Sequence, residues 1–264
     1  MSDDPFVLRT RDARDVITLT LNRPAAFNAL SEGMLAALQT ELDAVEADPS
    51  ARLVVLAAAG KAFCAGHDLK EMRAEPSRAY YEALFAKCTR MMLSVQRLSV
   101  PVIARVQGVA TAAGCQLVAT CDLAVASSSA KFAVSGVNLG LFCSTPSVAL
   151  ARNVPRKQAM EMLLTGDFID ANEARTRGLV NRVAQPDALD AELESLVQRI
   201  VAKPRIAIVI GKAQFYRQVE TGIEAAYAIA GQAMACNMMD EAALEGVQAF
   251  IDKRKPAWAP PDGA

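Results

Sequence analysis

The sequence predicts an α/β fold that ends in a mainly helical region, and three observations carry the prediction. Short β-branched or apolar runs alternate with stretches of helical periodicity through the first half of the chain, which is the order of elements in an α/β core. After Pro155 the helical pattern continues almost alone. The chain has 264 residues, of which 52% are hydrophobic, so it can bury one large core, with or without an appended region.

The first three elements are predicted as strand, helix and strand. Residues 16–21 form a β-branched run that ends before Pro24, where proline stops a strand ladder. The following helix has Ser31 placed to cap its first turn. Its apolar positions at helical spacing are Leu35, Leu38, Leu42 and Val45. Residues 53–59 are continuously apolar and end at Gly60, the pattern of a strand that is covered on both faces.

The middle of the chain continues this alternation. Apolar residues recur at intervals of three and four over 78–98 and predict a long amphipathic helix. Strands are predicted at 101–106 and 122–126, and a Gly/Ala segment between them opens a helix near Ala113.

The C-terminal third is predicted to be helical. Helices are expected over 156–164 and in further stretches up to residue 253, with one short strand at 206–210. We therefore expect an α/β core of residues 1–200 and a helical region of residues 201–264 that packs on a neighbouring subunit as well as on its own core.

Composition and charge exclude several kinds of partner. Lys plus Arg number 28 and Asp plus Glu 29, and this formal net charge of −1 gives no overall attraction to nucleic acid or an anionic membrane. The acidic N-terminus lacks the features of a signal or transit peptide. The polar residues that make the apolar stretch 100–126 unsuitable as a membrane span are Arg105, Gln107, Gln116 and Asp122. The six cysteines form no CxxC pair, so a reducing, cytoplasmic location is predicted.

Two runs of small residues carry the functional signal. Residues 62–70 read AFCAGHDLK and contain His67, the only histidine of the chain. Residues 110–116 read ATAAGCQ. Small residues in such runs let the main chain approach a ligand or another backbone. The second run can alternatively be interpreted as a site where a helix and a strand cross closely, without a ligand.

Together the two runs resemble the paired oxyanion-hole segments of the crotonase (enoyl-CoA hydratase/isomerase) superfamily. Further segments resemble the landmarks of that family in the correct order and extend the resemblance over nearly the whole chain; they are 21–24, 28–30, 62–72, 101–126, 138–141, 164–166 and 178–181. The segments 110–119 and 140–146 resemble more narrowly the branch of enoyl-CoA hydratase domain-containing proteins. The resemblance implies a spiral of strand-helix units that ends in a helical trimerisation region.

The resemblance implies that an acyl-CoA thioester binds between the two runs. It assigns the oxyanion-hole donors to the backbone N–H groups of His67 and Ala113, beside the small residues Ala65 and Gly114. Reactions at the α or β carbon of a thioester place negative charge on its oxygen, and two fixed N–H groups stabilise that charge. The side chain of His67 is not needed for this, and a polar loop residue at the ligand entrance is its alternative role.

The two glutamates with which hydratases of this family add water are replaced here. The resemblance aligns those positions with Gln116 and Gly136, and neither residue can act as a general acid or base. Gln116 is expected either to hold a water or a substrate carbonyl, or to be a buried amide satisfied by backbone. Standard hydration is therefore doubtful.

Cys143 and Ser144 are alternative reactive groups in the loop that follows Gly140. Either nucleophile would need a base, and the sole histidine is His67. Plain packing is the favoured role of Cys143. Decarboxylases of the family share the Ala-Gly-His-Asp start of the first motif, but a tyrosine usual in that group is replaced by Cys143.

The resemblance also assigns the coenzyme A contacts. Arg23 and Lys70 are candidates for its phosphates, with Lys253, Arg254 or Lys255 contributed by a partner subunit. The other candidate substrate-binding residues are Ala25, Ala65, Asp68, Leu69, Gly114, Gly136 and Cys143. No Walker-type loop or metal-ligand cluster is present in the sequence, so no cofactor is expected other than the coenzyme A of the substrate.

We therefore predict an acyl-CoA-binding enzyme of lyase or isomerase type, active in fatty acid metabolism, that forms trimers or a hexamer built as a dimer of trimers. The alternatives are a crotonase fold that binds acyl-CoA or a partner without catalysis, and a decarboxylase-like or thioesterase-like enzyme.

Overall fold

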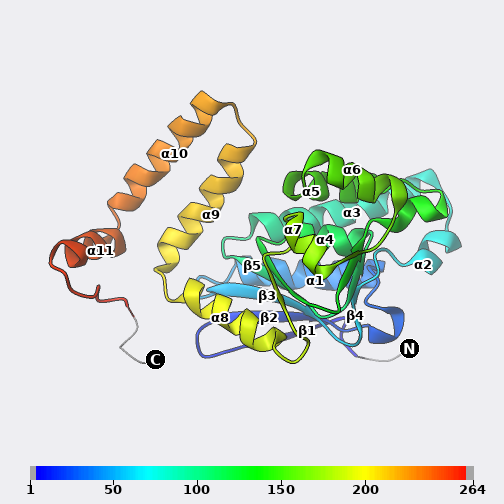
Figure 1. Cartoon of the computed structure of the whole chain (residues 1–264), viewed down its shortest axis with the longest axis horizontal. Helices are drawn as coiled ribbons and strands as arrows, with labels where there is room; N and C mark the ends of the chain where they lie inside the picture. Colours follow the sequence, from blue (N-terminus) through cyan, green and yellow to red (C-terminus); the bar gives the residue numbers. More distant parts are fainter. Residues whose placement is uncertain (1–3, 260–264) are drawn as a thin grey trace. The chain divides into compact units, whose positions relative to one another are not determined.

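The computed structural model describes residues 4–259 of the chain. They divide into two compact units, which are described separately (Figure 1). Within the described residues, unit 1 comprises 4–98 and 102–193, and unit 2 comprises 99–101 and 194–259.

Unit 1 is built on a six-stranded sheet in the order β1-β2-β3-β5-β7-β10. Its strands are β1 (Val7–Arg11), β2 (Val16–Leu21), β3 (Leu53–Ala58), β5 (Val102–Val106), β7 (Leu123–Ser127) and β10 (Arg182–Ala184). β1 pairs antiparallel with β2, and the other pairs are parallel. Every residue of β3 is buried, because parallel strands connected by helices are covered on both faces.

A smaller sheet of four strands brings the functional segments together. Its order is β4-β6-β8-β9, formed by β4 (Ala62–Cys64), β6 (Val109–Thr111), β8 (Lys131–Ala133) and β9 (Ile169–Asp170). β4 and β6 lie side by side in parallel. The residues that follow them therefore leave the same edge of the sheet, and these are the two small-residue runs.

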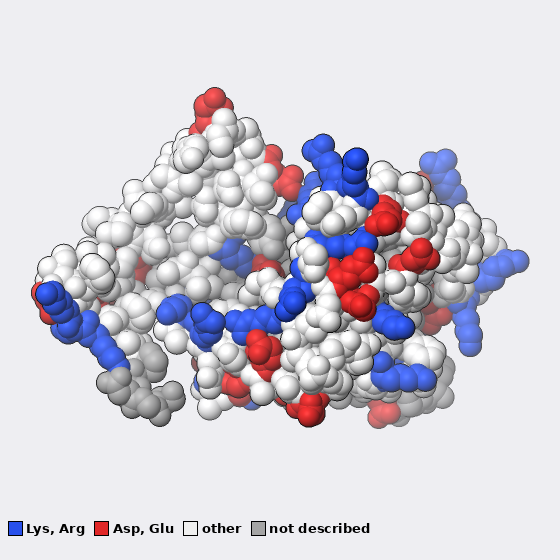
Figure 2. All heavy atoms as spheres, in the orientation of Figure 1, with Lys and Arg blue, Asp and Glu red and all other residues white. Residues whose placement is uncertain are grey.

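Helices cover the sheets of unit 1. They are α1 (Glu32–Glu46), α2 (Leu69–Ala74), α3 (Arg78–Arg97), α4 (Ala113–Thr120), α5 (Ser144–Asn153), α6 (Arg156–Thr165) and α7 (Ala171–Thr176), with 3-10 turns at η1 (Pro24–Ala26) and η2 (Ser135–Leu139). The side chain of Ser31 accepts the Met34 N–H, so the predicted cap of α1 is confirmed. On the visible face of unit 1, basic and acidic side chains are interspersed (Figure 2), in keeping with the near-neutral charge.

Unit 2 is helical and contains the one element whose type was predicted wrongly. Its helices are α8 (Leu189–Val201), which begins in unit 1, α9 (Arg205–Val219), α10 (Ile223–Met238) and α11 (Glu241–Ile251). α9 and α10 form a hairpin (Figure 1). The predicted strand 206–210 is the first part of α9, because Pro204 precedes a run that continues helically and local β-propensity yields to that context.

Several strands were not foreseen. β1, β6, β8, β9 and β10 are all short or partly exposed, and α5 begins at Ser144, which was expected to lie in the loop after Gly140. No helix within residues 4–259 is both long and apolar enough to cross a membrane. The six cysteines are free thiols, and all but Cys236 are buried.

Candidate active site

A cavity of about 610 Å³ lies in unit 1 where the ends of β4 and β6 meet η1, α2, α3 and the loop before α5. Ten of the candidate site residues line it; they are Arg23, Ala25, Ala65, His67, Asp68, Leu69, Lys70, Ala113, Gly136 and Cys143. Gln116 and Gly114 lie outside the lining. Lys253 belongs to unit 2.

The two small-residue runs touch through their backbones. A Cβ atom placed on Gly66, whose φ is +92°, would lie 3.0 Å from Cβ of Ala112 and 3.3 Å from the backbone nitrogen of Ala113. A Cβ on Gly114 would lie 2.1 Å from the carbonyl oxygen of Cys64. Larger residues would push β4 and α4 apart, so Gly114 acts through packing under the cavity rather than through contact with a ligand.

Two backbone N–H groups at this contact have no acceptor among the described residues, namely those of His67 and Ala113. Leu30 donates to the carbonyl of Gly66 at 2.7 Å, and its own carbonyl accepts the N–H of Asp68 at 3.4 Å, so this bridge leaves the His67 N–H unused. Ala113 begins α4, and the first N–H groups of a helix lack intrahelical partners. Both residues line the cavity.

This arrangement suits an anion that develops on a bound ligand. Two backbone donors that need no reorganisation stabilise such a charge, and the N-terminus of α4 adds a favourable dipole. Ala112, which precedes Ala113, adopts φ +50° and ψ −120°. A non-glycine residue in this region is strained, and strain of this kind concentrates at functional sites.

The imidazole of His67 is an isolated polar group. Its ring packs edge-on against Phe85, with 5.5 Å between ring centroids. Nδ1 and Nε2 are both buried, and neither has a hydrogen-bond partner among the described residues. Burial lowers the pKa of His67, and the nearby Leu30 carbonyl opposes this shift only in part. The ring is therefore neutral near physiological pH.

Gln116 and Gly136 carry no side-chain group that can act as a general acid or base. Gln116 is 6% exposed on α4, and its Oε1 is buried without a partner in the described part of the chain. Gly136 lines the cavity, but a Cβ there would lie 2.5 Å from the carbonyl oxygen of Leu141 and 2.7 Å from Sγ of Cys143. The loop that ends at Cys143 thus occupies the space that a side chain at position 136 would need.

Asp68 is the one carboxylate among the residues that line the cavity, and its oxygens are already engaged. It accepts the N–H groups of Lys70 at 3.1 Å and Glu71 at 3.4 Å, as the N-cap of α2. Nη1 of Arg23 lies 3.4 Å from its other oxygen, and the same guanidinium rests over the ring of Phe6. Asp68 thus shapes the entrance to α2 and orients Arg23 at the cavity.

Cys143 and Ser144 do not form a nucleophile-base pair. Sγ of Cys143 accepts the N–H of Gly136 at 3.3 Å, and burial raises the pKa of this thiol. The hydroxyl of Ser144 donates to the carbonyl of Phe142 at 3.4 Å. Neither is bonded to His67, whose ring nitrogens have no partner within residues 4–259, so a triad of the kind considered from the sequence is not assembled.

The sequence interpretation missed several apolar residues of the cavity, namely Phe27, Met72, Phe85, Leu139, Leu141 and Phe142. Leu139, Leu141 and Phe142 are exposed. In the sequence, the apolar residues on both sides of Gly140 were the pattern that could have indicated an apolar wall of the cavity. No group of three or more metal-ligating side chains suited to a metal ion exists in the described part of the chain.

Comparisons with known proteins agree with this architecture. The family model for enoyl-CoA hydratase/isomerase matches residues 11–261. The mitochondrial enoyl-CoA hydratase domain-containing protein 3 of Mus musculus is 42% identical over 97% of this chain and 85% of its own length.

Solved structures show the same fold. An enoyl-CoA hydratase from Mycobacterium smegmatis superposes with a TM-score of 0.96 at 68% identity, covering 97% of this chain and 99% of that one. Human enoyl coenzyme A hydratase domain-containing protein 3 gives a TM-score of 0.92 at 42% identity, covering 96% of this chain and 100% of that one. The predicted crotonase-like α/β fold is thus confirmed, and the chain belongs to the enoyl-CoA hydratase/isomerase family of acyl-CoA enzymes.

Proposed function

We propose that this protein is an enzyme that binds an acyl-CoA thioester and stabilises its enolate with the backbone N–H groups of His67 and Ala113. The observation that carries the proposal is the pair of donors without acceptors, both of which line a cavity of about 610 Å³. Removing one donor of such a site typically lowers the rate by about 10²–10³.

The reaction belongs to the lyase or isomerase type, and water addition by two carboxylates is not supported. Gln116 lies outside the cavity lining and Gly136 has no room for a side chain. The Mycobacterium smegmatis structure is named an enoyl-CoA hydratase, so hydration is the activity to be tested first. Decarboxylation and thioester hydrolysis are then tested with the same protein, by identifying the products formed from each thioester.

Coenzyme A would be held at the edge of the cavity that Arg23 and Lys70 line, where guanidinium and ammonium groups can meet its phosphates. Ala25, Ala65, Leu69 and the other small or apolar lining residues would contact the pantetheine and acyl parts. Lys253 would contribute from a partner subunit. Arg254 is less suited to that role because Glu245 accepts two hydrogen bonds from it, at 2.6 and 2.9 Å.

We further propose self-association as a trimer or a dimer of trimers, and a cytoplasmic location. The curated mouse relative carries the word mitochondrial in its name, so cell fractionation with a specific antibody decides the location. No cofactor beyond the coenzyme A of the substrate is part of the proposal.

A non-catalytic acyl-CoA-binding or interaction module is the second candidate, and the replaced carboxylate positions favour it. Both candidates require binding of a thioester. Calorimetry with a panel of acyl-CoA thioesters tests this shared step, and absence of binding to every member would refute both.

Turnover separates the two candidates. Each thioester is incubated with the protein and the products are identified by mass spectrometry. In Ala113→Pro the N–H donor is lost at the first helical position, where proline is compatible with a helix, whereas Ala113→Gly keeps the donor. We expect turnover to fall about 10²–10³-fold in Ala113→Pro and to be largely kept in Ala113→Gly, with folding of both checked by circular dichroism. Absence of turnover in the unmodified protein would favour the binding module.

A further inference from the structure

Asn28 is a fully buried polar residue to which the proposed chemistry gives no role. Its exposed fraction is 0%, and its side chain forms well-made hydrogen bonds at both ends. Oδ1 accepts the backbone N–H of Arg23 at 2.8 Å. Nδ2 donates to the carbonyls of Ala59 and Ala62, both at 2.9 Å. Because bonds of these lengths are close to ideal, Asn28 fastens the chain at residues 23–28 to the turn that leads into β4.

The backbone around Asn28 has an unusual conformation. Phe27 and Asn28 both have positive φ, at +51° and +55°. A non-glycine residue occupies this region at a cost in free energy, which is smallest for asparagine and aspartate. Such a conformation persists only where the surrounding contacts determine it. The buried hydrogen bonds of Asn28 are contacts of this kind, and they hold the start of residues 27–30, here called the clamp segment.

The clamp segment is bonded to the His67 loop, which comprises residues 65–68. The two are joined by backbone hydrogen bonds, written from N–H to carbonyl, of Ala65 to Phe27 at 3.0 Å, of Leu30 to Gly66 at 2.7 Å and of Asp68 to Leu30 at 3.4 Å. The residues on both sides of His67 are therefore attached to the same segment.

The bond from Leu30 to the carbonyl of Gly66 determines where the N–H of His67 points. That carbonyl and that N–H belong to one planar trans peptide, in which the two groups point in opposite directions. By holding the carbonyl, Leu30 directs the N–H of His67 away from itself. His67 lines the cavity and Leu30 does not, so this orientation suits a donor that serves a bound ligand.

We infer that Asn28 is a positioning residue for the thioester site: by holding the clamp segment in place, it fixes the direction in which the His67 N–H meets the thioester oxygen. The inference rests on the proposed function, in which that N–H is one of the two donors. Asn28 is absent from the residues that line the cavity. It therefore acts through Leu30 and the Gly66–His67 peptide, without contact to the ligand and without a covalent step.

Gln107 separates the contribution of Asn28 from that of the turn before β4. Its Nε2 donates to carbonyls of that turn and of the end of β3, namely those of Ala58, Gly60 and Ala62, at 2.9, 3.0 and 3.1 Å. The turn is thus held a second time, from the connection between β5 and β6. Loss of the Asn28 side chain should leave the turn in place and release mainly the clamp segment.

The single histidine of the chain gives a direct measurement of the donor. In protein labelled with ¹⁵N-histidine, the backbone amide signal of a ¹H–¹⁵N correlation spectrum belongs to His67. Saturation of the unmodified protein with butyryl-CoA should move its amide proton to lower field, as a new hydrogen bond to the thioester oxygen does. The chemical shift of the saturated, folded protein does not depend on the fraction of molecules that are folded, so a loss of stability alone leaves it unchanged.

Asn28→Gly removes the side chain and keeps the positive φ accessible. We expect this variant to bind butyryl-CoA about three- to tenfold more weakly, measured by calorimetry, and to lose the shift of the His67 amide at saturation. Asn28→Asp keeps the acceptor for the N–H of Arg23 and lacks both donors. It should lose the shift in the same way, and it decides the question if Asn28→Gly does not fold.

Asn153→Gly is the matched control. Nδ2 of Asn153 also donates to two carbonyls, those of Ala119 and Ala149, at 2.9 and 2.8 Å. Ala119 lies near the end of α4, whereas Ala113 begins that helix, and none of these bonds involves the clamp segment. The control removes the same kind of side chain and should keep both the affinity and the shift of the His67 amide.

Hydrogen exchange in the unmodified protein tests the inference without a variant. The N–H of Arg23 is bonded to the side chain of Asn28, and the N–H groups of Leu30 and Ala65 join the clamp segment to the His67 loop. If Asn28 holds the clamp segment, Leu30 and Ala65 should lose protection only when Arg23 does. Lasting protection at Arg23 with rapid exchange at Leu30 and Ala65 would show that the loop opens independently, and would overturn the inference.

The outcomes separate this inference from the proposed function. If both Asn28 variants bind butyryl-CoA with the full shift of the His67 amide, the inference is overturned while the function stands. An equal loss of the shift in Asn153→Gly would assign the effect to general destabilisation and would also overturn it. If butyryl-CoA binds to the unmodified protein without moving the amide, His67 is not a donor and the proposed enolate site itself fails.

Discussion

Gly136 shows how a single residue limits what this site can do. The carbonyl oxygen of Leu141 and Sγ of Cys143 would lie 2.5 and 2.7 Å from a Cβ at this position. The N–H of Gly136 donates to that same sulfur at 3.3 Å. The loop that ends at Cys143 thus fills the space that a side chain at position 136 would need.

Gly136→Ala is therefore expected to destabilise the protein by about 1–3 kcal/mol, because overpacking forces a rigid backbone carbonyl to move. Urea unfolding followed by circular dichroism measures the change. The matched control is Gly211→Ala in α9, where a Cβ meets nothing within 4 Å and alanine favours the helix. Equal stability of Gly136→Ala and the unmodified protein would show that the loop is not closed over this position.

Gln116→Glu alone is expected to leave hydration of crotonyl-CoA within about tenfold of the unmodified protein, since general acid-base catalysis needs groups that reach the substrate. Oε1 of Gln116 is buried away from the cavity lining, and Gly136 still supplies no second acid. The loss of crotonyl-CoA absorbance follows the reaction, with an active hydratase assayed in parallel. Efficient hydration by this single variant would mean that the site has been aligned incorrectly.

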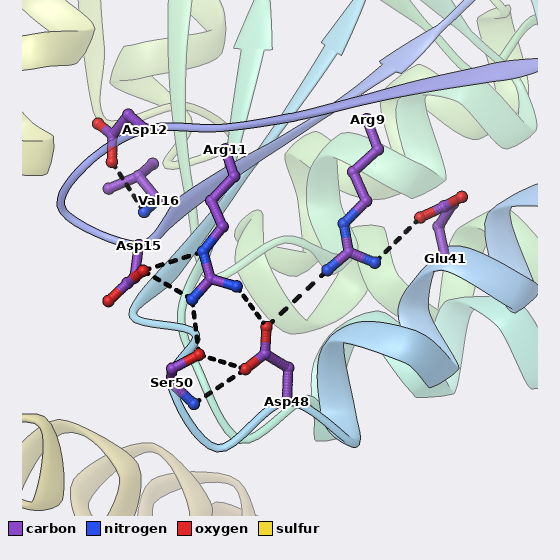
Figure 3. Close-up of polar contacts among 8 residues, drawn as sticks. All are labelled: Arg9, Arg11, Asp12, Asp15, Val16, Glu41, Asp48 and Ser50. Atoms are coloured by element: carbon purple, nitrogen blue, oxygen red, sulfur yellow. Dashed lines mark hydrogen bonds and ion pairs between the residues drawn. The ribbon is translucent and has the colours of Figure 1, made fainter.

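At the scale of elements, β1 is attached to α1 and to the loop that follows α1 by a network of charged side chains (Figure 3). Arg9 and Arg11 alternate along β1, and both reach the carboxylate of Asp48, at 4.0 and 2.9 Å. Arg9 also pairs with Glu41 at 3.4 Å. The hydroxyl and N–H of Ser50 donate to Asp48 as well. Because β1 is an edge strand, this network adds a connection that the sheet itself provides on only one side.

Asp48→Asn tests this network through its pH dependence. The hydrogen bonds from Ser50, followed by the charges of Arg11 and Arg9, hold the pKa of Asp48 below its usual value of 3.8. When folding lowers the pKa of a carboxyl group, the resulting stabilisation is complete at pH values above the pKa of the unfolded protein. It is lost as the pH falls through the pKa of the folded protein. We expect the unmodified protein to be more stable than Asp48→Asn at neutral pH, and the difference to shrink steadily below pH 3.8.

Urea unfolding at a series of pH values gives this difference. Glu82→Gln serves as control, since its pair with Arg78 lies along one exposed helix, where such pairs contribute little. A stability difference for Asp48→Asn that is the same at neutral and acid pH would contradict the role given to its charge.

Elements with a strong local pattern were predictable from the sequence, and those formed by tertiary pairing were not. The continuous apolar run of β3 and the capped amphipathic face of α1 were identified within a residue or so. β10 was not, because Arg-Val-Ala at 182–184 has no strand pattern and is a strand only through its pairing with β7. Residues 206–210 have the composition of a strand, but they form the start of α9 because the residues that follow them continue as a helix.

The same distinction applies to the site. The backbone donors at His67 and Ala113 were expected from the resemblance to the crotonase superfamily, and the small residues around them allow the close approach that such donors need. The burial of Gln116 away from the cavity depends on how α4 is rotated, and the unpartnered ring of His67 depends on what packs around it. Neither follows from sequence spacing alone.

At the scale of the whole molecule, unit 2 exposes more apolar surface than its own fold explains. Phe250 is 85% exposed, Met239 76% and Tyr227 75%, and further apolar side chains on α9, α10 and α11 are exposed with them. Many exposed large apolar side chains within one unit are typical of a protein interface. This exposed surface supports the proposal that the helical region associates with further copies of this chain.

Phe250→Asp is therefore expected to weaken self-association, because the interface would have to bury an unpaired charge. Light scattering coupled to size-exclusion chromatography should show the mass of a trimer or hexamer for the unmodified protein and a shift toward the monomer for the variant. Gln232→Asp adds the same charge at an exposed polar position of α10 and should leave the mass unchanged. A monomeric unmodified protein, or a variant with unaltered mass, would leave the exposed surface of unit 2 without this role, and the predicted contribution of Lys253 from a partner subunit would lose its basis.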